Sequence, residues 1–271
     1  MAFEEISRRG LVLLGCGKMG SAMLAGWLDR GISPESVHVI DPAPSEWVQS
    51  TGVHINEPLP SNPAIALIAV KPQMMGDALP NLRQMGGGAT LFVSIAAGTS
   101  LAQFANAFGP TSPIVRAMPN TPAAVGRAIT AIIGNPLVTD AHLTMTEELL
   151  SAIGQVVRLD DENQMDAVTA VSGSGPAYVF HLIETLAAAG QDQGLSADLA
   201  LKLARATVAG AGVLAEDTPE SPTQLRKNVT SPGGTTQAAL GVLMDPESGF
   251  PALVKRAVAA AAQRSKELSN G

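Results

Sequence analysis

The stretch Gly15-Cys16-Gly17-Lys18-Met19-Gly20 decides the fold of this chain. It follows the apolar run Leu11–Leu14, which predicts a buried strand, and it opens a segment with helical spacing. An acidic residue, Asp41, ends the next β-branched run, 21 residues beyond Gly20. A lone glycine triplet is weak evidence. A strand, a glycine-rich turn, a helix and an acid in this order are typical of a dinucleotide-binding turn.

Each glycine of this turn has its own expected role. Gly15 permits the tight turn, Gly17 lets the backbone approach a pyrophosphate, and Gly20 lets the helix pack closely on the strand. The N-terminus of the helix supplies free N–H donors to the phosphates. Cys16 is interpreted as a small residue that fits the turn, because no neighbouring histidine is present to activate it as a nucleophile. A purely structural glycine-rich turn is the alternative.

Asp41 bears on the choice of cofactor. Its carboxylate is expected to accept hydrogen bonds from the adenosine ribose 2′-OH, which favours NADH. A 2′-phosphate would meet a like charge there. No arginine between Arg30 and Arg83 is available to hold that phosphate, and Ser45 is the only obvious polar donor nearby. NADPH remains the alternative cofactor.

Short β-branched runs alternate with helical stretches over the first 160 residues. This alternation predicts a mostly parallel sheet with helices on both faces. The expected strands are Leu11–Leu14, Val37–Asp41, Ile65–Val70, Thr90–Ile95, Ile114–Ala117, Ile129–Ile133 and Val156–Leu159. Ligands bind beyond the carboxyl ends of such strands. We therefore expect two further segments to face the cofactor, Ala69-Val70-Lys71-Pro72 and Ser94-Ile95-Ala96-Ala97-Gly98. Leu14, which ends the first strand, is also expected at the cofactor.

The pattern changes near Asp160. No strand is expected from there to Gly271, and helices are expected over Glu162–Val171, Ala177–Gln191, Ala197–Ala215, Pro222–Asn228, Thr235–Met244 and Pro251–Leu268. The sequence thus predicts an α/β protein in which an N-terminal Rossmann-type, doubly wound sheet (residues 1–160) precedes an all-helical domain (161–271). That helical domain is expected to bind substrate and to dimerise.

The dimer is expected from the segment Ala204–Leu214, which is almost free of charge. A helix that is apolar on most sides needs burial on most sides, and about 110 residues offer little interior of their own. An intertwined homodimer would supply that burial. Packing against the first domain is the alternative.

Composition excludes several classes of protein. Hydrophobic residues make up 46% and charged residues 15% of 271 residues, as in a globular protein. The net charge of −7 and the lack of a basic run argue against nucleic acid as a partner. No apolar stretch is long enough for a membrane span. The single cysteine fits a reducing compartment, so a cytoplasmic location is expected, and no metal site is expected.

Two unusual segments interrupt the helical half. Ser172-Gly173-Ser174-Gly175-Pro176-Ala177 should end one helix and start another at Pro176. The segment Asn228–Thr236 presents hydroxyl groups and free backbone N–H groups at a helix start, an arrangement suited to a carboxylate. A pair of ordinary capped turns is the alternative for both segments.

Five motifs in order resemble the pyrroline-5-carboxylate reductase family over residues 10–268. They are Gly-Cys-Gly-Lys-Met-Gly at 15–20, Ala-Val-Lys-Pro at 69–72, Met-Pro-Asn-Thr-Pro at 118–122, Ser-Gly-Ser-Gly-Pro-Ala-Tyr at 172–178 and Ser-Pro-Gly-Gly-Thr-Thr at 231–236. The last motif is the most specific. One departure is Met244, where the family usually has a polar or acidic residue.

The resemblance implies a Rossmann domain with a helical dimerisation domain, active sites shared between subunits, and decamers in some members. It implies NADPH or NADH as cofactor and the cyclic imine 1-pyrroline-5-carboxylate as substrate, reduced to L-proline in the last step of proline biosynthesis. By motif, Glu162 and Asn228 join Ile95–Ala97 at the cofactor. Ser231, Gly234, Thr235 and Thr236 hold the substrate, and Thr236 is the expected partner of the ring nitrogen.

Two other functions are weighed against this one. A β-hydroxyacid dehydrogenase has a similar plan but uses a lysine of the helical domain as acid and base. No lysine occurs between Lys71 and Lys202. A non-catalytic dinucleotide sensor needs no second polar pocket, yet the turn at 230–236 offers one. Tyr178 and His181, which follow the interrupting segment, are interpreted as structural.

Overall fold

The computed structural model describes residues 2–270, so Met1 and Gly271, the outer ends of the two expected domains, lie outside the described residues. The chain forms two compact units. The first comprises the chain up to Gly173 together with the C-terminal turns from Ala262, and the second comprises Ser174–Ala261. Residues 161–173 therefore pack with the first unit. The domain boundary expected at residue 160 stays a prediction.

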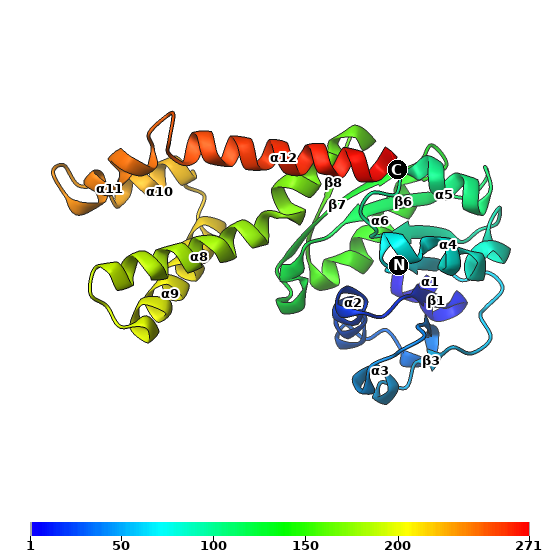
Figure 1. Ribbon diagram of the computed structural model, residues 1–271. Helices are drawn as coiled ribbons and strands as arrows, with labels where there is room; N and C mark the ends of the chain where they lie inside the picture. Colours follow the sequence, from blue (N-terminus) through cyan, green and yellow to red (C-terminus); the bar gives the residue numbers. More distant parts are fainter. Residues whose placement is uncertain (1, 271) are drawn as a thin grey trace. The chain divides into compact units, whose positions relative to one another are not determined.

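The first unit is built on one eight-stranded sheet (Figure 1) with strand order β3-β2-β1-β4-β5-β6-β7-β8. The strands are β1 Leu11–Leu14, β2 Val37–Ile40, β3 His54–Ile55, β4 Ile65–Ile68, β5 Leu91–Ser94, β6 Ile114–Met118, β7 Ala128–Gly134 and β8 Gly154–Arg158. All neighbours pair in parallel except β6 and β7, which are antiparallel. The predicted α/β class with a mostly parallel sheet is confirmed.

The central strands are apolar without alternation because helices cover both of their faces. Every residue of β1, β4 and β5 is buried. Two apolar clusters lie on opposite sides of the sheet, one around Trp27 and one around Phe92 and Phe104. The helices of this unit are α1 Ala2–Arg9, α2 Lys18–Asp29, α3 Glu46–Ser50, α4 Met75–Ala78, α5 Leu101–Phe108, α6 Asp140–Leu150 and α7 Met165–Val168.

Several predicted strands were one or two residues too long at the end that matters for binding. Asp41, Val70 and Ile95 follow strands β2, β4 and β5 and lie in the turns. The residues before them are apolar or β-branched, as in a strand, so the sequence does not indicate where each strand ends. In the structure, the chain leaves the sheet before these three residues. The two-residue strand β3 and the eight-residue helix α1 were not expected from the sequence. Helix α1 does have helical periodicity, with Ile6 on its buried side, but it is shorter than the stretches over which such periodicity is usually recognised.

The helix expected over Glu162–Val171 is interrupted. A 3₁₀ turn at Glu162–Gln164 leads into α7, and a π-helical turn follows at Thr169–Gly173. The side chain of Asn120 donates a 3.1 Å hydrogen bond to the carbonyl of Ser172, so the π turn is anchored to the loop after β6. A new helix starts at Gly175 with Pro176 in its first turn, close to the predicted start.

The second unit is all-helical, and no strand occurs in the described part of the chain after β8. Its helices are α8 Gly175–Asp192, α9 Ala197–Asp217, α10 Pro222–Asn228, α11 Thr235–Leu243 and most of α12 Phe250–Asn270. Helices α8 and α9 form an antiparallel pair with a small core of Ala187, Ala200 and Ala204. Among the described residues, no helix is both long enough and apolar enough to span a bilayer.

Large apolar side chains cover the surface of the second unit. They include Phe180 (58% exposed), Leu203 (48%), Val213 (48%), Leu214 (55%) and Val242 (72%). So much exposed apolar area is typical of a surface that another chain covers. A shallow groove of about 400 Å³ lies between α8 and α9, and most of its lining residues are Ala and Leu.

Candidate functional site

The glycine-rich turn after β1 has the geometry expected of a phosphate-binding turn. Gly15 has a φ of +88°, and a Cβ there would lie 2.8 Å from the side chain of Val70. A Cβ on Gly20 would lie 2.5 Å from the carbonyl oxygen of Gly15, so only glycine lets α2 approach the strand. Gly17 has nothing within 4 Å of its Cβ position. Two glycines are thus needed for packing, and the third leaves an open space.

That open space lies at the N-terminus of α2. Gly17 is the N-cap residue, and no described side chain caps the helix. The first N–H groups of a 12-residue helix are therefore available to a ligand, with the positive end of the helix dipole behind them. A pyrophosphate is the group that such a turn fits.

Asp41 lies just beyond β2 and faces the same turn. Its Oδ2 accepts a 2.6 Å hydrogen bond from the N–H of Cys16, and its Oδ1 accepts a 2.8 Å bond from the N–H of Ala43. Asn56 holds the Asp41 backbone on both sides, with bonds of 3.0 and 2.8 Å. The carboxylate is thus fixed at the strand end, with lone pairs remaining for a ribose hydroxyl. Ser45 accepts a bond from the N–H of Val48 and caps α3.

A pocket of about 360 Å³ lies at the ends of β1, β2 and β4, and Ile40 and Pro42, on either side of Asp41 in the chain, line it. Leu14 and Val70, both predicted site residues, are part of its lining. Asn56, Met74 and Asn81 also line it and were missed from the sequence. Asn56 adopts a positive φ of 54°, which Asn tolerates better than most residues. Its residue type was therefore the one feature of the sequence that could have indicated a special role for it.

The other predicted residues of the first unit lie at the same edge of the sheet. Ala69 follows β4, and its N–H donates to the carbonyl of Leu14 at 2.8 Å. Lys71 is exposed. Ile95 and Ala96 follow β5. Since the carboxyl ends of parallel strands meet at one edge, the structure brings together the glycine-rich turn, Asp41, 69–72 and 95–97.

Cys16 is buried inside this turn. Burial raises the pKa of its thiol above the usual value, with a smaller opposing effect from the Ser21 hydroxyl. A thiol held protonated is a poor nucleophile. The prediction that Cys16 is a small fitting residue agrees with these properties.

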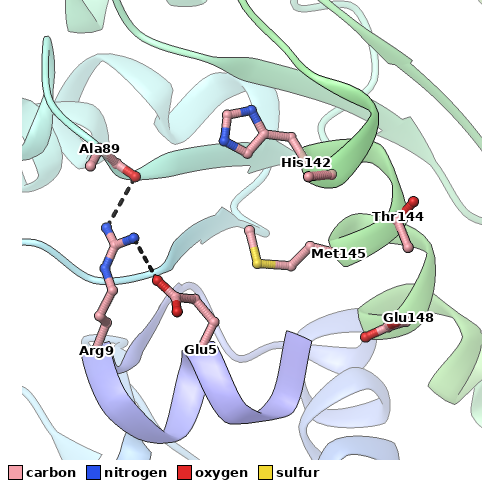
Figure 2. A pocket seen from close by; sticks show the side chains of 8 residues that line it. Glu5, Arg9, Ala89, His142, Thr144, Met145 and Glu148 are labelled. Carbon is pink, nitrogen blue, oxygen red and sulfur yellow. Dashed lines mark hydrogen bonds and ion pairs between the residues drawn. The ribbon is translucent and has the colours of Figure 1, made fainter. Parts of the chain in front are cut away.

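A second pocket, about 300 Å³, lies between α1 and α6 (Figure 2). Arg9 is on its wall and donates to the carbonyl oxygens of Asn62, Pro63 and Ala89, which precede β4 and β5. This pocket is therefore at the amino edge of the sheet. It does not adjoin the predicted binding residues.

The second unit holds the turn predicted to bind a carboxylate. Gly233 has a φ of +71°, and a Cβ on Gly234 would lie 2.5 Å from the Ser231 hydroxyl oxygen. Gly234 is the N-cap of α11 and offers no side-chain cap, so the N–H groups of the first turn are open. Within the described residues, the hydroxyl groups of Thr235 and Thr236 have no hydrogen-bond partner. Hydroxyl groups and open backbone N–H groups thus occur together at one helix start.

Asn228, the other predicted site residue of this unit, ends α10. Its side-chain amide donates to both carboxylate oxygens of Glu220 and accepts a 2.7 Å bond from Gln224. His181 pairs with Glu184 on the surface of α8. The described residues hold no cluster of His, Cys, Asp and Glu that could bind a metal ion.

Comparison with known proteins identifies the family. Residues 162–268 match the model of pyrroline-5-carboxylate reductase dimerisation, and residues 10–98 match that of NADP oxidoreductase, coenzyme F420-dependent. The chain is 43% identical to a pyrroline-5-carboxylate reductase of Synechocystis, over 95% of this chain and 97% of the relative. The chain belongs to the pyrroline-5-carboxylate reductase family.

Other pyrroline-5-carboxylate reductases agree over the same length. That of Pseudomonas aeruginosa is 37% identical and covers 96% of both chains. The solved structure from Coxiella burnetii superposes with a TM-score of 0.89 at 32% identity, over 96% of this chain and 98% of that one. The structure from Plasmodium falciparum, described with NADP bound, superposes with a TM-score of 0.83 at 30% identity, over 97% and 99%. The family expected from the five motifs is confirmed.

Proposed function

We propose that this chain is a pyrroline-5-carboxylate reductase, which reduces 1-pyrroline-5-carboxylate to L-proline with NADPH or NADH. The observation that carries the proposal is the pairing, in one chain, of an open glycine-rich turn at Gly17 with an uncapped, hydroxyl-rich helix start at Gly234–Thr236. The relatives named above match this chain over nearly its whole length, a range that includes both segments. A sensor would need only the first feature.

The first unit supplies the cofactor residues in this proposal. Gly15–Met19 and the N-terminus of α2 hold the pyrophosphate, and Asp41 with the pocket beside Asn56 holds the adenosine. Ala69–Pro72, Ile95–Ala97 and Glu162 hold the remaining half, with Asn228 added by resemblance. When bound, the reduced nicotinamide supplies a hydride.

The second unit supplies the substrate residues. The substrate carboxylate is held by the open N–H groups at the start of α11 and by the hydroxyl groups of Ser231 and Thr235. Gly234 lets the turn close because a side chain there would collide with Ser231. This anchor fixes one end of the ring, and Thr236 fixes the other by hydrogen-bonding the ring nitrogen.

Beyond binding the two reactants, the reduction requires few groups of the protein. Hydride adds to the imine carbon, the C=N bond becomes a single bond, and a proton on nitrogen completes the amine. An imine that enters protonated already carries that proton. Positioning two reactants correctly can lower the barrier by about 7–11 kcal/mol. No lysine or carboxylate base is required, and none is assigned.

Self-association completes the proposal. The exposed apolar faces of α8 and α9 are expected to pair with those of a second copy in a homodimer, as the dimerisation model suggests. Assembly of dimers into decamers is a further proposal that rests on the resemblance alone. We also propose a cytoplasmic location and a preference for NADH, the latter from Asp41.

A steady-state assay tests the proposal. Purified protein is mixed with 1-pyrroline-5-carboxylate and either NADH or NADPH, and oxidation of the cofactor is followed. Turnover with a higher kcat/KM for NADH is expected. The six-membered homologue should also be tried, because one methylene changes binding by only about 1–3 kcal/mol. Absence of turnover with both cofactors would contradict the proposal.

A further inference from the structure

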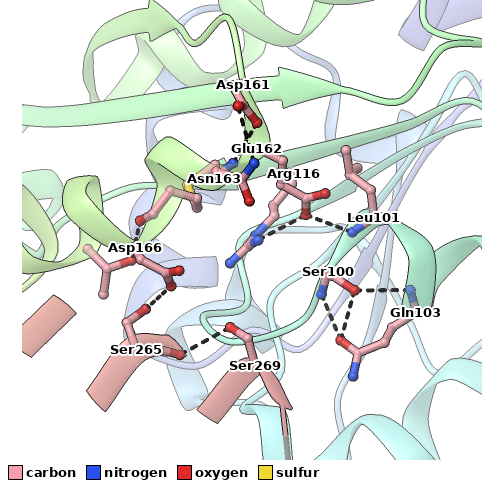
Figure 3. A network of polar contacts seen from close by, with 12 residues as sticks. Ser100, Leu101, Gln103, Arg116, Asp161, Glu162, Asn163, Asp166, Ser265 and Ser269 are labelled. Carbon is pink, nitrogen blue, oxygen red and sulfur yellow. Dashed lines mark hydrogen bonds and ion pairs between the residues drawn. The ribbon is translucent and has the colours of Figure 1, made fainter. Parts of the chain in front are cut away.

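Glu162, in the 3₁₀ turn after β8, connects this turn to the start of α5 and to β6 (Figure 3). One of its oxygens, Oε1, accepts hydrogen bonds from the backbone N–H of Leu101 and from Nη1 of Arg116, both at 2.9 Å. Leu101 is the first residue of α5, and Arg116 lies in β6. A single carboxylate therefore ties a helix start to a neighbouring strand.

The helix start is the far end of the loop that follows β5. Residues 95–100 form this loop, and residues 95–97 are proposed to contact the cofactor. The near end is fixed by the sheet, since the N–H of Ile95 donates to the carbonyl of Ile68 at 3.0 Å. At the far end, Ser100 and Gln103 form a capping box. The N–H of Leu101 would otherwise be an unpaired donor, and Glu162 satisfies it with a negative charge at the helix N-terminus.

Arg116 is what holds Glu162 in that place. Its side chain is 6% exposed, against 31% for Glu162. It pairs in register with Ser94, the last residue of β5, so its backbone lies beside the residue from which the loop begins. Figure 3 shows its guanidinium turned toward Glu162. Both side chains line a polar cavity of about 480 Å³, together with Ser100 and Asp166.

A buried ion pair is weak evidence for stability, because desolvation of the two charges offsets most of their attraction. The pair does, however, fix a direction in space for the Glu162 carboxylate, and through it for the Leu101 N–H. Its consequence is therefore geometric.

We propose that Arg116 is a positioning residue for the cofactor: through Glu162 it holds the start of α5 and so sets the conformation of residues 95–100. The inference rests on the proposed function only in that residues 95–97 contact the cofactor. It differs from the role that the resemblance gives Glu162, since here Glu162 acts through the Leu101 backbone.

The test compares Arg116→Met with a matched control, Arg158→Met. Arg158, in β8, makes an ion pair with Glu147, in α6, with 2.6 Å between Nε and Oε1. This pair belongs to the same unit, but it lies far along the chain from the loop at 95–100. Amide hydrogen exchange of the cofactor-free protein should accelerate at Leu101 in Arg116→Met alone. The dissociation constant of NADPH or NADH, read from cofactor fluorescence, should rise by about 10-fold, which corresponds to about 1.4 kcal/mol of lost contact free energy. The kcat at saturating cofactor should change much less, and Arg116→Lys should recover part of the affinity.

A double variant, Arg116→Met with Glu162→Met, tests whether Arg116 acts through Glu162. It removes both partners of the ion pair, so its loss of cofactor affinity should equal that of Glu162→Met alone and not the sum of the two single losses. Recovery of affinity in this variant would overturn the proposal. Equal losses in Arg116→Met and Arg158→Met would also overturn it. If wild-type protein binds cofactor but does not reduce the imine, the proposed function fails while the binding data still decide the role of Arg116.

Discussion

The backbone N–H of Cys16 donates a 2.6 Å hydrogen bond to the carboxylate of Asp41, 25 residues further along the chain. This bond joins the glycine-rich turn after β1 to the end of β2. We therefore propose two roles for Asp41: its carboxylate holds the glycine-rich turn in place, and its remaining lone pairs accept hydrogen bonds from the ribose.

Cofactor choice should follow the charge of Asp41. Asp41→Ser should raise the ratio of kcat/KM for NADPH to that for NADH by about 5-fold or more, since removing a charge near a phosphate is worth roughly 1–4 kcal/mol. Asp41→Asn is the control, because it loses the charge but keeps an acceptor for the Cys16 N–H. A ratio that stays constant in both variants would mean that Asp41 does not contact the ribose.

Gly17 and Gly20 should fail in different ways. Gly17→Val should fold with a melting temperature near that of the wild type, because nothing lies within 4 Å of the new Cβ, but it should lose cofactor binding. Gly20→Ala should lower the melting temperature, because its Cβ would lie 2.5 Å from the Gly15 carbonyl oxygen. Thermal melts and cofactor titration distinguish the two effects. Tight cofactor binding by Gly17→Val would mean that the glycine-rich turn is not part of the cofactor site.

Association should depend on the apolar face of α9. Ala211 is exposed in the isolated chain, so Ala211→Glu should not disturb the helix itself. In a dimer the same charge would be buried without a partner, which is costly. Light scattering should show a smaller species or unfolded protein for Ala211→Glu, and the wild-type assembly for the control Ala211→Ser. A wild-type protein that is active as a monomer would exclude a shared active site.

Thr236 should affect the substrate and not the cofactor. Thr236→Val keeps the shape and deletes the hydroxyl, so the ring nitrogen loses a partner at a cost of about 1–3 kcal/mol. The expected loss in kcat/KM for the imine is about 5- to 150-fold, with cofactor affinity nearly unchanged. Thr223→Val, in α10, is a control of the same chemistry and should behave as the wild type. If Thr236→Val weakens cofactor binding instead, the turn at 231–236 contacts the cofactor and not the substrate.

The parts of this structure that depend on local pattern were predictable. Leu11–Leu14, the glycine-rich turn and α10 have the expected bounds, because apolar runs, caps and glycine decide them locally. The contacts that depend on distant residues were not predictable. Nothing in the sequence indicates that Glu162 accepts from Leu101 and Arg116, or that Asn56 holds the backbone of Asp41, since each pairing depends on how the strands are ordered.

Transfer of an isotopic label tests the central claim most directly. The protein is incubated with 1-pyrroline-5-carboxylate and a reduced cofactor that carries deuterium at the transferable position of nicotinamide C4. The account predicts L-proline with one deuterium on the ring carbon that was the imine carbon. Proline without the label, or labelled cofactor recovered unchanged beside unreacted imine, would contradict it.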